Sequence, residues 1–431
     1  MTHADAQQAS SRGDQPIGVL YSFPHVLGRT GIGYTAWQQV SGLVQQGVPV
    51  WLAAGRIARP VPGVRAAFET LRFGPLPLKH RMLGKWRACQ VHDRRVAGWL
   101  GRLGSDVRVV HGWPGGSLAT FEAARRAGVA SVVERPNAHT GFAFETVDRL
   151  HQELGLVAAA GHSHRPDPAR LAREEAEYAA ADGLLCPSPF VAETFRDRGY
   201  AEDQLLLHRY GYDDERFTPA DEANASDDRA NDARPGLRVA FCGGCEPRKG
   251  LHDLLAAWVE SRASDTGRLR IAGAFTPGYR EKCAEHLGHP SVTEDGFVDD
   301  VPDLMRWADV LALPSYEEGS ALVTYEAMGA GTPLLVSTAS GAFAEDGVHG
   351  LFHMPGDRAG LRSHLDRLAS EPDLLPRLRA GVLEHRVNAT WSAAAEALVD
   401  AYGTVLRRRG EATHSKTASE PSAPEVAPAW T

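Results

Sequence analysis

Cysteine and lysine are scarce in this sequence. Five cysteines in 431 residues are too few for the disulfide framework of a small secreted domain. Cys242 and Cys245 have the spacing of half a zinc site, but the chain has no second such pair, so we predict no metal site. The simpler interpretation is that these two small residues pack beside a tight glycine turn. Lysine occurs only at positions 79, 85, 249, 282 and 416.

Long apolar runs and an excess of positive charge are also missing. No stretch approaches the run of about 18 apolar residues that predicts a transmembrane helix. Residues 1–15 are polar and small and lack the apolar core of a secretion signal, so we predict a cytoplasmic protein. The 46 basic and 54 acidic side chains give a formal charge of −8, which argues against general nucleic-acid binding. The 43% of hydrophobic and 23% of charged residues are typical of a globular protein and exclude a mostly disordered chain.

Short apolar runs alternate with helical patterns in the first half of the chain. An initial strand at 17–23 is followed by a glycine-containing loop and by a helix from about 34 to 46, closed by Gly47. This βαβ beginning predicts a parallel sheet covered by helices on both faces. The further strands are predicted at 48–53, 107–111, 129–134, 183–186 and 205–209, with helices at 116–127 and 189–198.

A second series of strands and helices follows a polar, acidic stretch at 219–236, which we interpret as a linker or solvated loop. Its strands are predicted at 237–242, 268–272, 292–297, 310–313 and 334–337. Its helices are predicted at 251–261, 322–329, 358–369, 374–388 and 392–408. The predicted organisation is a flexible N-terminus (1–15), a first Rossmann-like domain (16–218), the linker (219–236), a second Rossmann-like domain (237–390), a C-terminal helix (391–410) and a tail too polar to fold alone (411–431).

This organisation predicts an α/β protein with two doubly wound domains that face a central cleft. In open α/β sheets, ligands bind beyond the carboxyl ends of the strands. When two such domains face each other, the natural binding site is the cleft between them.

The sharpest local pattern is the stretch 314–333, in which a strand ends and a helix begins. Glu318 lies just before the expected helix start, and Glu326 lies within the helix. The free backbone N–H groups at a helix start form an anion site, and a carboxylate accepts two hydrogen bonds from a vicinal diol. A nucleotide sugar has a diphosphate between two diol-bearing rings and suits this arrangement. The alternative is an ordinary helix whose acidic residues stabilise its dipole.

A second pattern, the stretch 241–250, lies at the end of the first strand of the second half. Gly243 and Gly244 allow close approach of the backbone to a ligand. Arg248 and Lys249 place cations beside a helix N-terminus, where a diphosphate would be doubly attracted. The alternative is a surface turn with a solvated basic pair, because lysine beside glycine is not a specific signal.

Three weaker patterns lie in the first half. The loop with Gly31, Ile32 and Gly33 follows the first strand and suits a cleft that admits a substrate, although such glycines can serve the turn alone. His139, after a predicted strand, is a candidate proton carrier or hydrogen-bond donor to a sugar hydroxyl; the alternative is a structural histidine. The basic stretch 79–108 is a candidate contact for an anionic membrane surface or a phosphorylated acceptor; the alternative is a solvated helix face.

Taken in order, these residues resemble the retaining glycosyltransferases of family 4, which have the two-domain GT-B fold. The resemblance covers roughly residues 17–408. Glu318 and Glu326 match the family's E-x7-E motif, with its EAM-x-x-G-x-P continuation at 326–333. Each further piece is weak alone, and the ordered set is specific: EYAAAD and PS at 177–188, GYD and FTP at 211–219, PRKG at 247–250 and PGD at 355–357.

The resemblance implies roles for the residues of the second domain. Glu326 would bind the ribose hydroxyls of the nucleotide, and Glu318 would hold hydroxyls of the transferred sugar. Lys249 would neutralise the diphosphate. The remaining donor-binding positions would be Gly243, Gly244, Arg248, Gly319, Ser320, Ala321, Leu322 and Val323.

For the first domain, the resemblance implies that the loop 31–33 admits the acceptor or the phosphates and that His139 lies near the donor sugar. The final helix would cross back and pack on this domain. Two positions depart from the family's pattern: Gly244 stands where many members have arginine, and Tyr210 stands where asparagine is usual. Arg248 is the nearest candidate to supply the missing phosphate contact.

The implied activity is transfer of a sugar from a nucleotide-diphosphate sugar to a glycan, lipid-linked or small-molecule acceptor, with retention of the anomeric configuration. No metal and no other cofactor is expected, because cations and helix dipoles would stabilise the leaving diphosphate. The enzyme would be cytoplasmic, and a peripheral contact with the inner membrane face through 79–108 stays open.

Three other functions stay open at this point. A phosphorylase or epimerase can use the same scaffold, but phosphorylases of the glycogen type need a lysine for pyridoxal phosphate. The folded part of the second half offers only Lys249 and Lys282. A non-catalytic sugar-nucleotide-binding protein would bind the donor without turnover. A dinucleotide-dependent dehydrogenase needs a third glycine after Gly31 and Gly33, at the position of Ala36.

Overall fold

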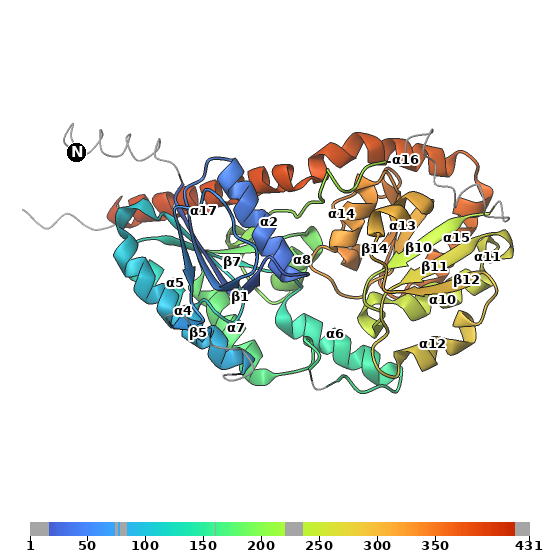
Figure 1. The fold of residues 1–431 in the computed structure, drawn as a ribbon, viewed down its shortest axis with the longest axis horizontal. Helices are drawn as coiled ribbons and strands as arrows, with labels where there is room; N and C mark the ends of the chain where they lie inside the picture. Colours follow the sequence, from blue (N-terminus) through green and yellow to red (C-terminus); the bar gives the residue numbers. More distant parts are fainter. Residues whose placement is uncertain (1–16, 74–75, 78–83, 160, 220–235, 419–431) are drawn as a thin grey trace, which may run out of the picture.

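Two α/β halves lie side by side in the computed structural model, which describes residues 17–73, 76–77, 84–159, 161–219 and 236–418 (Figure 1). The predicted N-terminal segment 1–15 lies outside the described residues. So do residues 220–235 of the predicted linker and residues 419–431. The last helix, α17 (Trp391–Ala418), begins at the junction of the halves and runs back over the first half (Figure 1).

The first half is built on a seven-stranded sheet of order β3-β2-β1-β6-β7-β8-β9, in which every pairing is parallel. Its strands are β1 (Val19–Leu27), β2 (Val50–Ile57), β3 (Ala66–Glu69), β6 (Val109–Gly112), β7 (Ala130–Glu134), β8 (Gly183–Cys186) and β9 (Leu205–Leu207). Its helices are α2 (Ile32–Gln45), α4 (Lys85–Leu103), α5 (Leu118–Arg126), α6 (Thr140–Glu153), α7 (Pro168–Ala180) and α8 (Pro189–Arg196). A separate antiparallel pair is formed by β4 (Arg72–Phe73) and β5 (Leu76–Pro77).

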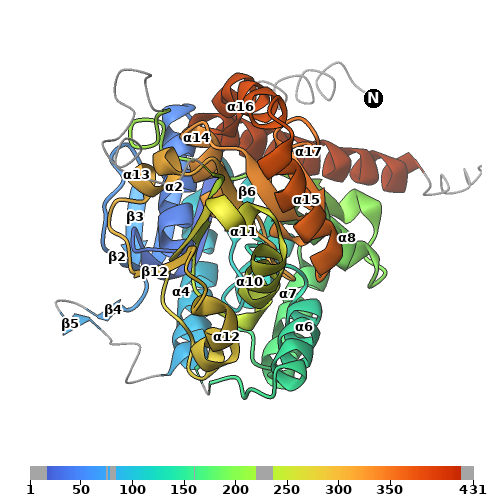
Figure 2. The same cartoon turned by 90° about the vertical axis from the view of Figure 1, so that its right-hand side faces the viewer.

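The second half is built on a six-stranded parallel sheet of order β12-β11-β10-β13-β14-β15. Its strands are β10 (Arg238–Cys242), β11 (Arg268–Ala272), β12 (Val292–Gly296), β13 (Val310–Leu313), β14 (Leu334–Ser337) and β15 (Gly350–His353). Helices α10, α12 and α15 lie on one side of this sheet and α13 and α14 on the other (Figure 2). The helices are α10 (Leu251–Glu260), α11 (Ala263–Thr266), α12 (Tyr279–Leu287), α13 (Val301–Trp307), α14 (Leu322–Gly329), α15 (Arg358–Ser370) and α16 (Leu374–His385).

Three fully buried strands are observed at the bounds that the sequence predicts, and complete burial explains why their apolar runs were readable. All residues of β8, β13 and β14 are buried, because helices cover both faces of a parallel sheet. The predicted ranges 183–186, 310–313 and 334–337 coincide with these strands. The sequence analysis missed β15, because Gly350 and His353 have little strand propensity of their own and pairing with β14 places them.

The end of the last helix corrects a sequence-based boundary. The helix was expected to end near residue 408 and to be followed by a non-folding tail from 411, but α17 continues to Ala418. Residues 411–418 contain neither glycine nor proline, so nothing in them interrupts a helix that is already formed. No helix in the described ranges has the length and apolar content needed to cross a bilayer.

The strand order reverses beside β1 in one sheet and beside β10 in the other. In doubly wound sheets, ligands bind at such a reversal, outside the carboxyl ends of the strands. The glycine-containing loops 28–31 and 243–250 follow these two strands directly. The predicted architecture of two doubly wound domains is therefore confirmed, and it brings both loops to ligand-binding positions.

A buried polar network attaches α17 to the first sheet. Tyr402 Oη lies 2.7 Å from Nδ1 of His111 on β6, and Nε2 of His111 lies 3.5 Å from the carboxylate of Glu134 on β7. Glu134 also accepts hydrogen bonds from His208 Nε2 at 3.0 Å and Tyr210 Oη at 2.9 Å. Burial alone would raise the pKa of Glu134, but the neighbouring histidines hold it at about 2.

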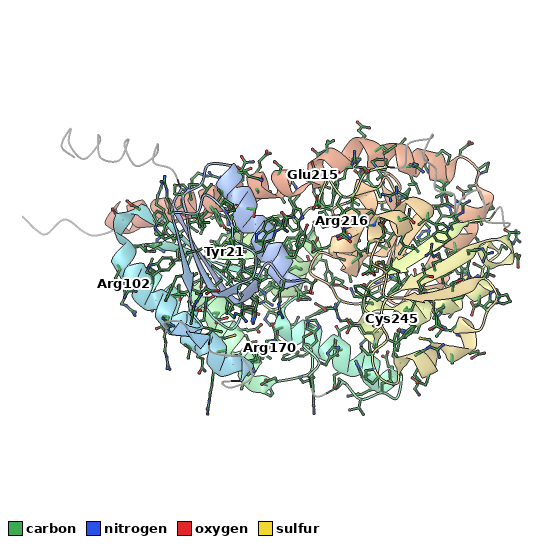
Figure 3. All side chains as sticks on the ribbon, viewed as in Figure 1. Tyr21, Arg102, Arg170, Glu215, Arg216 and Cys245 are labelled. Atoms are coloured by element: carbon green, nitrogen blue, oxygen red, sulfur yellow. The ribbon has the colours of Figure 1, made fainter. Side chains whose placement is uncertain are left out.

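An aromatic ring covers this network from the strand beside it. Tyr21 of β1, labelled inside the first half in Figure 3, stacks on His111 with ring centroids 4.4 Å apart. Tyr21 and Tyr402 belong to the same apolar cluster, together with Leu398 and Val405 of α17. The helix is therefore held by apolar packing around a polar centre that water does not reach.

Replacing Tyr402 with phenylalanine is expected to lower the free energy of unfolding. The substitution leaves His111 Nδ1 without its partner in a dry interior, which costs about 1–3 kcal/mol. Urea unfolding followed by circular dichroism measures this loss, with the exposed Glu396 of the same helix changed to glutamine as a control. An unfolding free energy unchanged in Tyr402→Phe would show that the network does not stabilise the attachment of α17.

Candidate functional site

A cavity of about 530 Å³ lies between the two halves. Its walls include segments that follow β1, β6 and β7 in the first half and β10 and β13 in the second, together with residues of α4 and α7. The carboxyl ends of both sheets thus meet at one cavity, in the position where a cleft was expected. The predicted site residues that line it are Gly31, Ile32, Gly243, Gly244, Arg248, Lys249, Glu318, Ser320, Ala321, Leu322 and Val323.

The start of α14 forms part of the second-half wall. No side chain caps this helix. The amides of Ala321 and Thr324 are used within the protein, as donors to the carbonyls of Ser340 and Ala321. The amides of Leu322 and Val323 are therefore the free donors of this helix start, which gives the cavity wall an anion-binding end.

Glu318 is paired with two cations in the same wall. Its carboxylate forms an ion pair with Lys249 Nζ, and its Oε2 lies 3.3 Å from Arg248 Nη1. Only 7% of Glu318 is exposed. Burial alone would raise the pKa of this carboxyl, but Arg248 and Lys249 hold it below its usual range. Arg248 also pairs with Glu246 Oε1 at 2.8 Å and with Glu317 Oε2 at 3.3 Å, so an anion entering the cavity competes with these carboxylates for the two cations.

The loop that carries Glu318 also joins the two halves. The neighbouring Glu317 accepts a hydrogen bond from the Ala138 amide at 3.2 Å, and Ser188 Oγ donates to the Gly319 carbonyl at 2.6 Å. At Gly319 a Cβ atom would lie 1.9 Å from the Pro136 oxygen, so only glycine lets the loop come this close to the first half. Gly319 serves this contact between the halves and is not among the residues that line the cavity.

Glu326 lies one turn along α14, beside the cavity rather than among its lining residues. It is close to Cys242, a lining residue, because burial and then the Glu326 carboxylate raise the pKa of that thiol to about 12. None of the described residues forms a hydrogen bond with the Glu326 carboxylate. Burial raises the pKa of Glu326 to about 7, with Arg216 acting in the opposite direction. A half-buried carboxyl without a hydrogen-bond partner, next to a cavity, is a candidate ligand-binding group.

The first-half wall adds charged and polar groups that the sequence analysis did not select as site residues. Lys85 begins α4, and Arg170 of α7 pairs with Glu174, whose Oε1 lies 2.6 Å from its Nε. His164 Nδ1 is buried without a hydrogen-bond partner. Burial and then the nearby arginines lower the pKa of His164 well below its usual range, so its ring is neutral. Figure 3 labels Arg170 near the lower edge of the first half.

His139 lies outside the cavity, which corrects its expected position beside the donor sugar. It caps α6, where its Nδ1 accepts a hydrogen bond from the Gly141 amide at 3.1 Å. Its ring packs on Phe195 and Tyr178, with centroids 5.0 and 5.6 Å away. Burial, followed by Arg135 and Arg198, lowers its pKa to about 3. The geometry is that of the structural alternative, because the cap turns the imidazole into the first-half core.

The sequence leaves open whether the glycines of the two loops line a ligand site or only serve a turn, and the structure shows examples of both. Gly243 and Gly244 line the cavity, and Gly243 has a φ of 150°, which side chains rarely adopt. Gly31 also lines the cavity. Gly33 does not, and a Cβ atom there would lie 2.5 Å from the Val26 oxygen. Gly33 therefore serves the turn.

Tyr210, which replaces the asparagine usual in the family, lines the cavity as well. Its Oη belongs to the buried Glu134 network described above. Its amide donates to Tyr325 Oη at 3.3 Å, and that hydroxyl lies 2.8 Å from Ser320 Oγ. The substitution thus connects the first-half core to the loop before α14.

Four cavity-lining residues that were not predicted as site residues differ in how clearly the sequence points to them. Asn137 lines the cavity and follows β7 at the same sheet edge as the loop after β1, which is a usable positional signal. Lys85 lies in the basic stretch 79–108. His164 and Arg170 belong to no motif, and only the fold brings them to the cavity.

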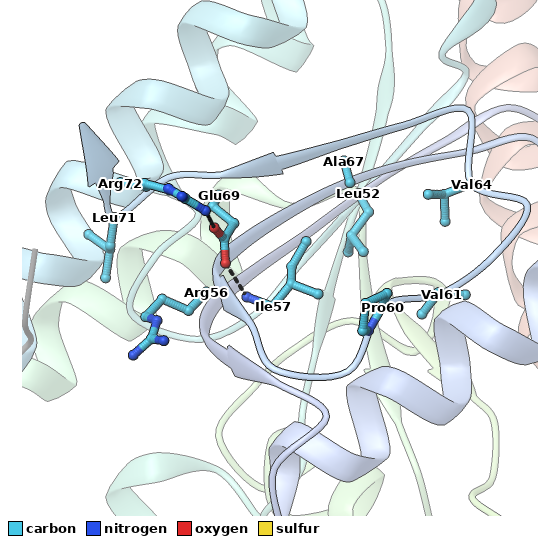
Figure 4. Close-up of a pocket in the computed structure, with 10 residues that line it drawn as sticks. All are labelled: Leu52, Arg56, Ile57, Pro60, Val61, Val64, Ala67, Glu69, Leu71 and Arg72. Carbon is cyan, nitrogen blue, oxygen red and sulfur yellow. Dashed lines mark hydrogen bonds and ion pairs between the residues drawn. The ribbon is translucent and has the colours of Figure 1, made fainter. Parts of the chain in front are cut away.

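Two further observations concern metal ions and other pockets. In the ranges that the structure describes, no group of three or more histidine, cysteine, aspartate or glutamate side chains could hold a metal ion; metal independence stays a prediction. A separate pocket of about 540 Å³ lies on β2 and β3, and none of the predicted site residues lines it (Figure 4). There Glu69 accepts a hydrogen bond from the Ile57 amide at 2.8 Å and pairs with Arg72 at 3.2 Å.

Comparison with known proteins gives this geometry a context. Residues 30–211 match the glycosyl transferase 4-like domain, and residues 236–371 match the family described as glycosyl transferases group 1. The D-inositol 3-phosphate glycosyltransferase of Stackebrandtia nassauensis is 30% identical over 333 residues, which cover 73% of this chain and 72% of that protein.

Solved structures of lower sequence identity share the fold. Sucrose-phosphate synthase from Thermosynechococcus elongatus superimposes with a TM-score of 0.63 at 20% identity, covering 94% of this chain and 100% of that one. Anabaena HepE in complex with UDP gives a TM-score of 0.62 at 14% identity, covering 90% and 100%. The GT-B fold predicted from the sequence is therefore confirmed. The two matched domains and the 30% identical relative show that this chain belongs to the glycosyltransferases of the family 4 type.

Proposed function

We propose that this glycosyltransferase takes its sugar from a nucleotide-diphosphate sugar bound in the cleft and transfers it with retention of the anomeric configuration, without a metal ion. The observation that carries the proposal is the pairing of Arg248 and Lys249 with Glu318 beside the free amides of α14. The phosphorylase, dehydrogenase and binding-protein alternatives are not favoured, because the chain matches glycosyltransferase domains.

The diphosphate is proposed to lie at the start of α14. The amides of Leu322 and Val323 and the positive end of the helix dipole favour an anion there, and Arg248 and Lys249 belong to the same wall. The departing diphosphate gains negative charge as the glycosidic bond breaks, so fixed cations and dipoles lower the barrier. These groups supply the charge that a metal ion would otherwise bring.

Glu318 and Glu326 are proposed to hold the two ends of the donor. When the diphosphate takes over Arg248 and Lys249, the Glu318 carboxylate becomes free to accept hydrogen bonds from hydroxyls of the transferred sugar. Glu326, which has no partner of its own, is proposed to accept the ribose diol. Retention of configuration is proposed from the resemblance to family 4, and the nuclear magnetic resonance spectrum of the first product tests it.

The acceptor is proposed to bind the first-half wall and to carry a negative charge. Lys85 and Arg170 line this wall, and lysine and arginine are common phosphate binders. Ile32, which is 40% exposed, adds an apolar contact. The Stackebrandtia relative is named for D-inositol 3-phosphate. Among glycan, lipid-linked and small-molecule acceptors, we therefore favour a small phosphorylated polyol.

The basic stretch 79–108 divides between the cavity and the surface. Residues 79–81 lie outside the described residues, Lys85 lines the cavity, and Arg95 donates to the carbonyl of Thr70 at 2.7 Å. Arg102, near the end of α4, is exposed (Figure 3). A contact of the exposed arginines with an anionic membrane stays a prediction, as does the cytoplasmic location.

The two glutamates are expected to separate nucleotide binding from turnover. Glu318→Gln should lower the transfer rate by at least about 100-fold and leave UDP or GDP affinity equal or higher, because Lys249 and Arg248 lose their competing carboxylate. Glu326→Ala should weaken nucleotide binding by about 10- to 100-fold. Isothermal titration and a product assay measure both effects.

The exposed Glu281 of α12 offers a matched control as Glu281→Gln. Wild-type activity in Glu318→Gln, or unchanged nucleotide affinity in Glu326→Ala, would remove these assignments.

The affinity for UDP is expected to rise with pH. Burial holds the pKa of Glu326 at about 7, so below this pH the carboxyl is protonated and loses acceptor capacity for the ribose diol. Between pH 6 and pH 8 the ionised fraction grows about 10-fold, and the UDP association constant should grow with it. In the Glu326→Gln variant, the pH dependence of UDP affinity reports the titration of the nucleotide alone. An equal pH dependence in both proteins would contradict the role of Glu326.

Removal of divalent cations is expected to leave sugar transfer unchanged. Excess EDTA should alter the initial rate by less than about twofold, because Arg248, Lys249 and the helix dipole provide the stabilising charge. The assay is repeated with added Mg²⁺ or Mn²⁺ as a control. A rate that collapses in EDTA and recovers with either ion would refute the metal-free mechanism.

A further inference from the structure

A second cavity, of about 440 Å³, also lies between the two halves. Segments after β8 and β9 form its first-half wall, and its second-half wall consists of the loop 341–345, His349 and the end of α16. It shares no lining residue with the donor cavity. We propose that this second cavity binds a small oxyanion, a phosphate or carboxylate group, at Arg209, His208 and His349.

Arg209 is a half-buried cation without a carboxylate partner among the described residues. Its guanidinium carbon lies 4.8 Å from the centre of the Phe343 ring, and its Nε is buried without a hydrogen-bond partner. Glu345, which is exposed, is the one acidic residue among the described residues that line this cavity. Burying an unpaired charge is unfavourable, so an anionic ligand complements this wall.

His208 provides a second polar group on the same wall. It is 7% exposed, and its Nε2 lies 3.0 Å from Glu134 Oε1. Its Nδ1 is buried and has no hydrogen-bond partner. Because the Nε2 proton is donated to Glu134, Nδ1 of the neutral ring is a hydrogen-bond acceptor. This unpaired buried atom can accept from the hydroxyl of a hydrogen phosphate.

His349 provides a donor from the opposite wall. Its Nδ1 accepts a hydrogen bond from the Glu345 amide at 2.9 Å, so the proton of the neutral ring lies on Nε2. The ring stacks on His385 with centroids 4.3 Å apart, and His385 Nε2 donates to the Phe343 carbonyl at 3.0 Å. These contacts fix the orientation of the His349 ring and leave its Nε2–H as a donor.

The wall of the second cavity continues into the loop of the donor site. Ser188, which lines the second cavity, donates to the Gly319 carbonyl at 2.6 Å. Ser320, which lines the donor cavity, donates to the Gly341 carbonyl at 2.8 Å. An anion that contacts Arg209 and His349 touches both halves and stabilises the arrangement in which this loop rests on the first half. This coupling rests on the proposed function, whereas anion binding itself does not.

Titration of the full-length enzyme with inorganic phosphate, in the presence of saturating UDP, tests the proposal. UDP fills the donor site, but phosphate can still bind the proposed acceptor wall at Lys85 and Arg170. The part of the phosphate binding that depends on Arg209 therefore reports the second cavity. Arg209→Gln is expected to weaken this binding at least about 10-fold without changing UDP affinity, and Arg209→Lys should retain most of it. Arg125→Gln, at an exposed arginine of α5, should bind phosphate as the wild type does.

A parallel titration with malonate distinguishes a carboxylate ligand from a phosphate ligand, and Arg209-dependent binding of either one supports the site. Absence of both, or equal binding by wild type and Arg209→Gln, overturns it. Arg209 has no ion pair to lose, and Arg209→Gln loses only the contact of the guanidinium with the Phe343 ring, so without anion the variant should melt close to the wild-type temperature. Failure of UDP to bind would contradict the proposed function alone, since Arg209-dependent phosphate binding is measurable without UDP.

Discussion

The positive charges of Arg248 and Lys249 lie in the cavity wall and must be neutralised by anions. The rest of the site follows from this requirement. The Glu318 carboxylate pairs with both cations, and Glu246 and Glu317 also pair with Arg248. A diphosphate at the start of α14 can replace Glu318, because the helix dipole and two free amides favour an anion there. In the proposed mechanism, one exchange of partners binds the leaving diphosphate and frees the carboxylate for the sugar.

The loop 317–320 makes this exchange depend on how the two halves meet. Gly319 touches the Pro136 segment so closely that no side chain fits, and Glu317 and Ser188 add hydrogen bonds across the junction. The same loop reaches the second cavity through Gly341. The charge pair, the helix start and the contact between the halves are therefore parts of one connected structure, and α17 strengthens it by attachment to the first-half core.

The fold was predictable from the sequence because buried parallel strands and helix starts have strong local signals. The strand 310–313 is a continuous apolar segment, and the spacing of Glu318 and Glu326 pointed to the helix 322–329 and to the cavity wall that carries Glu318. The rest depended on three-dimensional packing. His139 carried the right residue type at the right sheet edge, yet its capping hydrogen bond turns it inward. His164 and Arg170 reach the cavity only because the halves fold against each other.

The most direct test of the central claim is a crystal structure of the enzyme with an intact nucleotide sugar. The account predicts phosphate oxygens within hydrogen-bonding distance of Lys249 Nζ and the Leu322 and Val323 amides. It also predicts the ribose diol on Glu326 and sugar hydroxyls on a Glu318 that has left the cations. A bound donor whose phosphates lie away from α14, with the pairing of Glu318 to Lys249 intact, would contradict it.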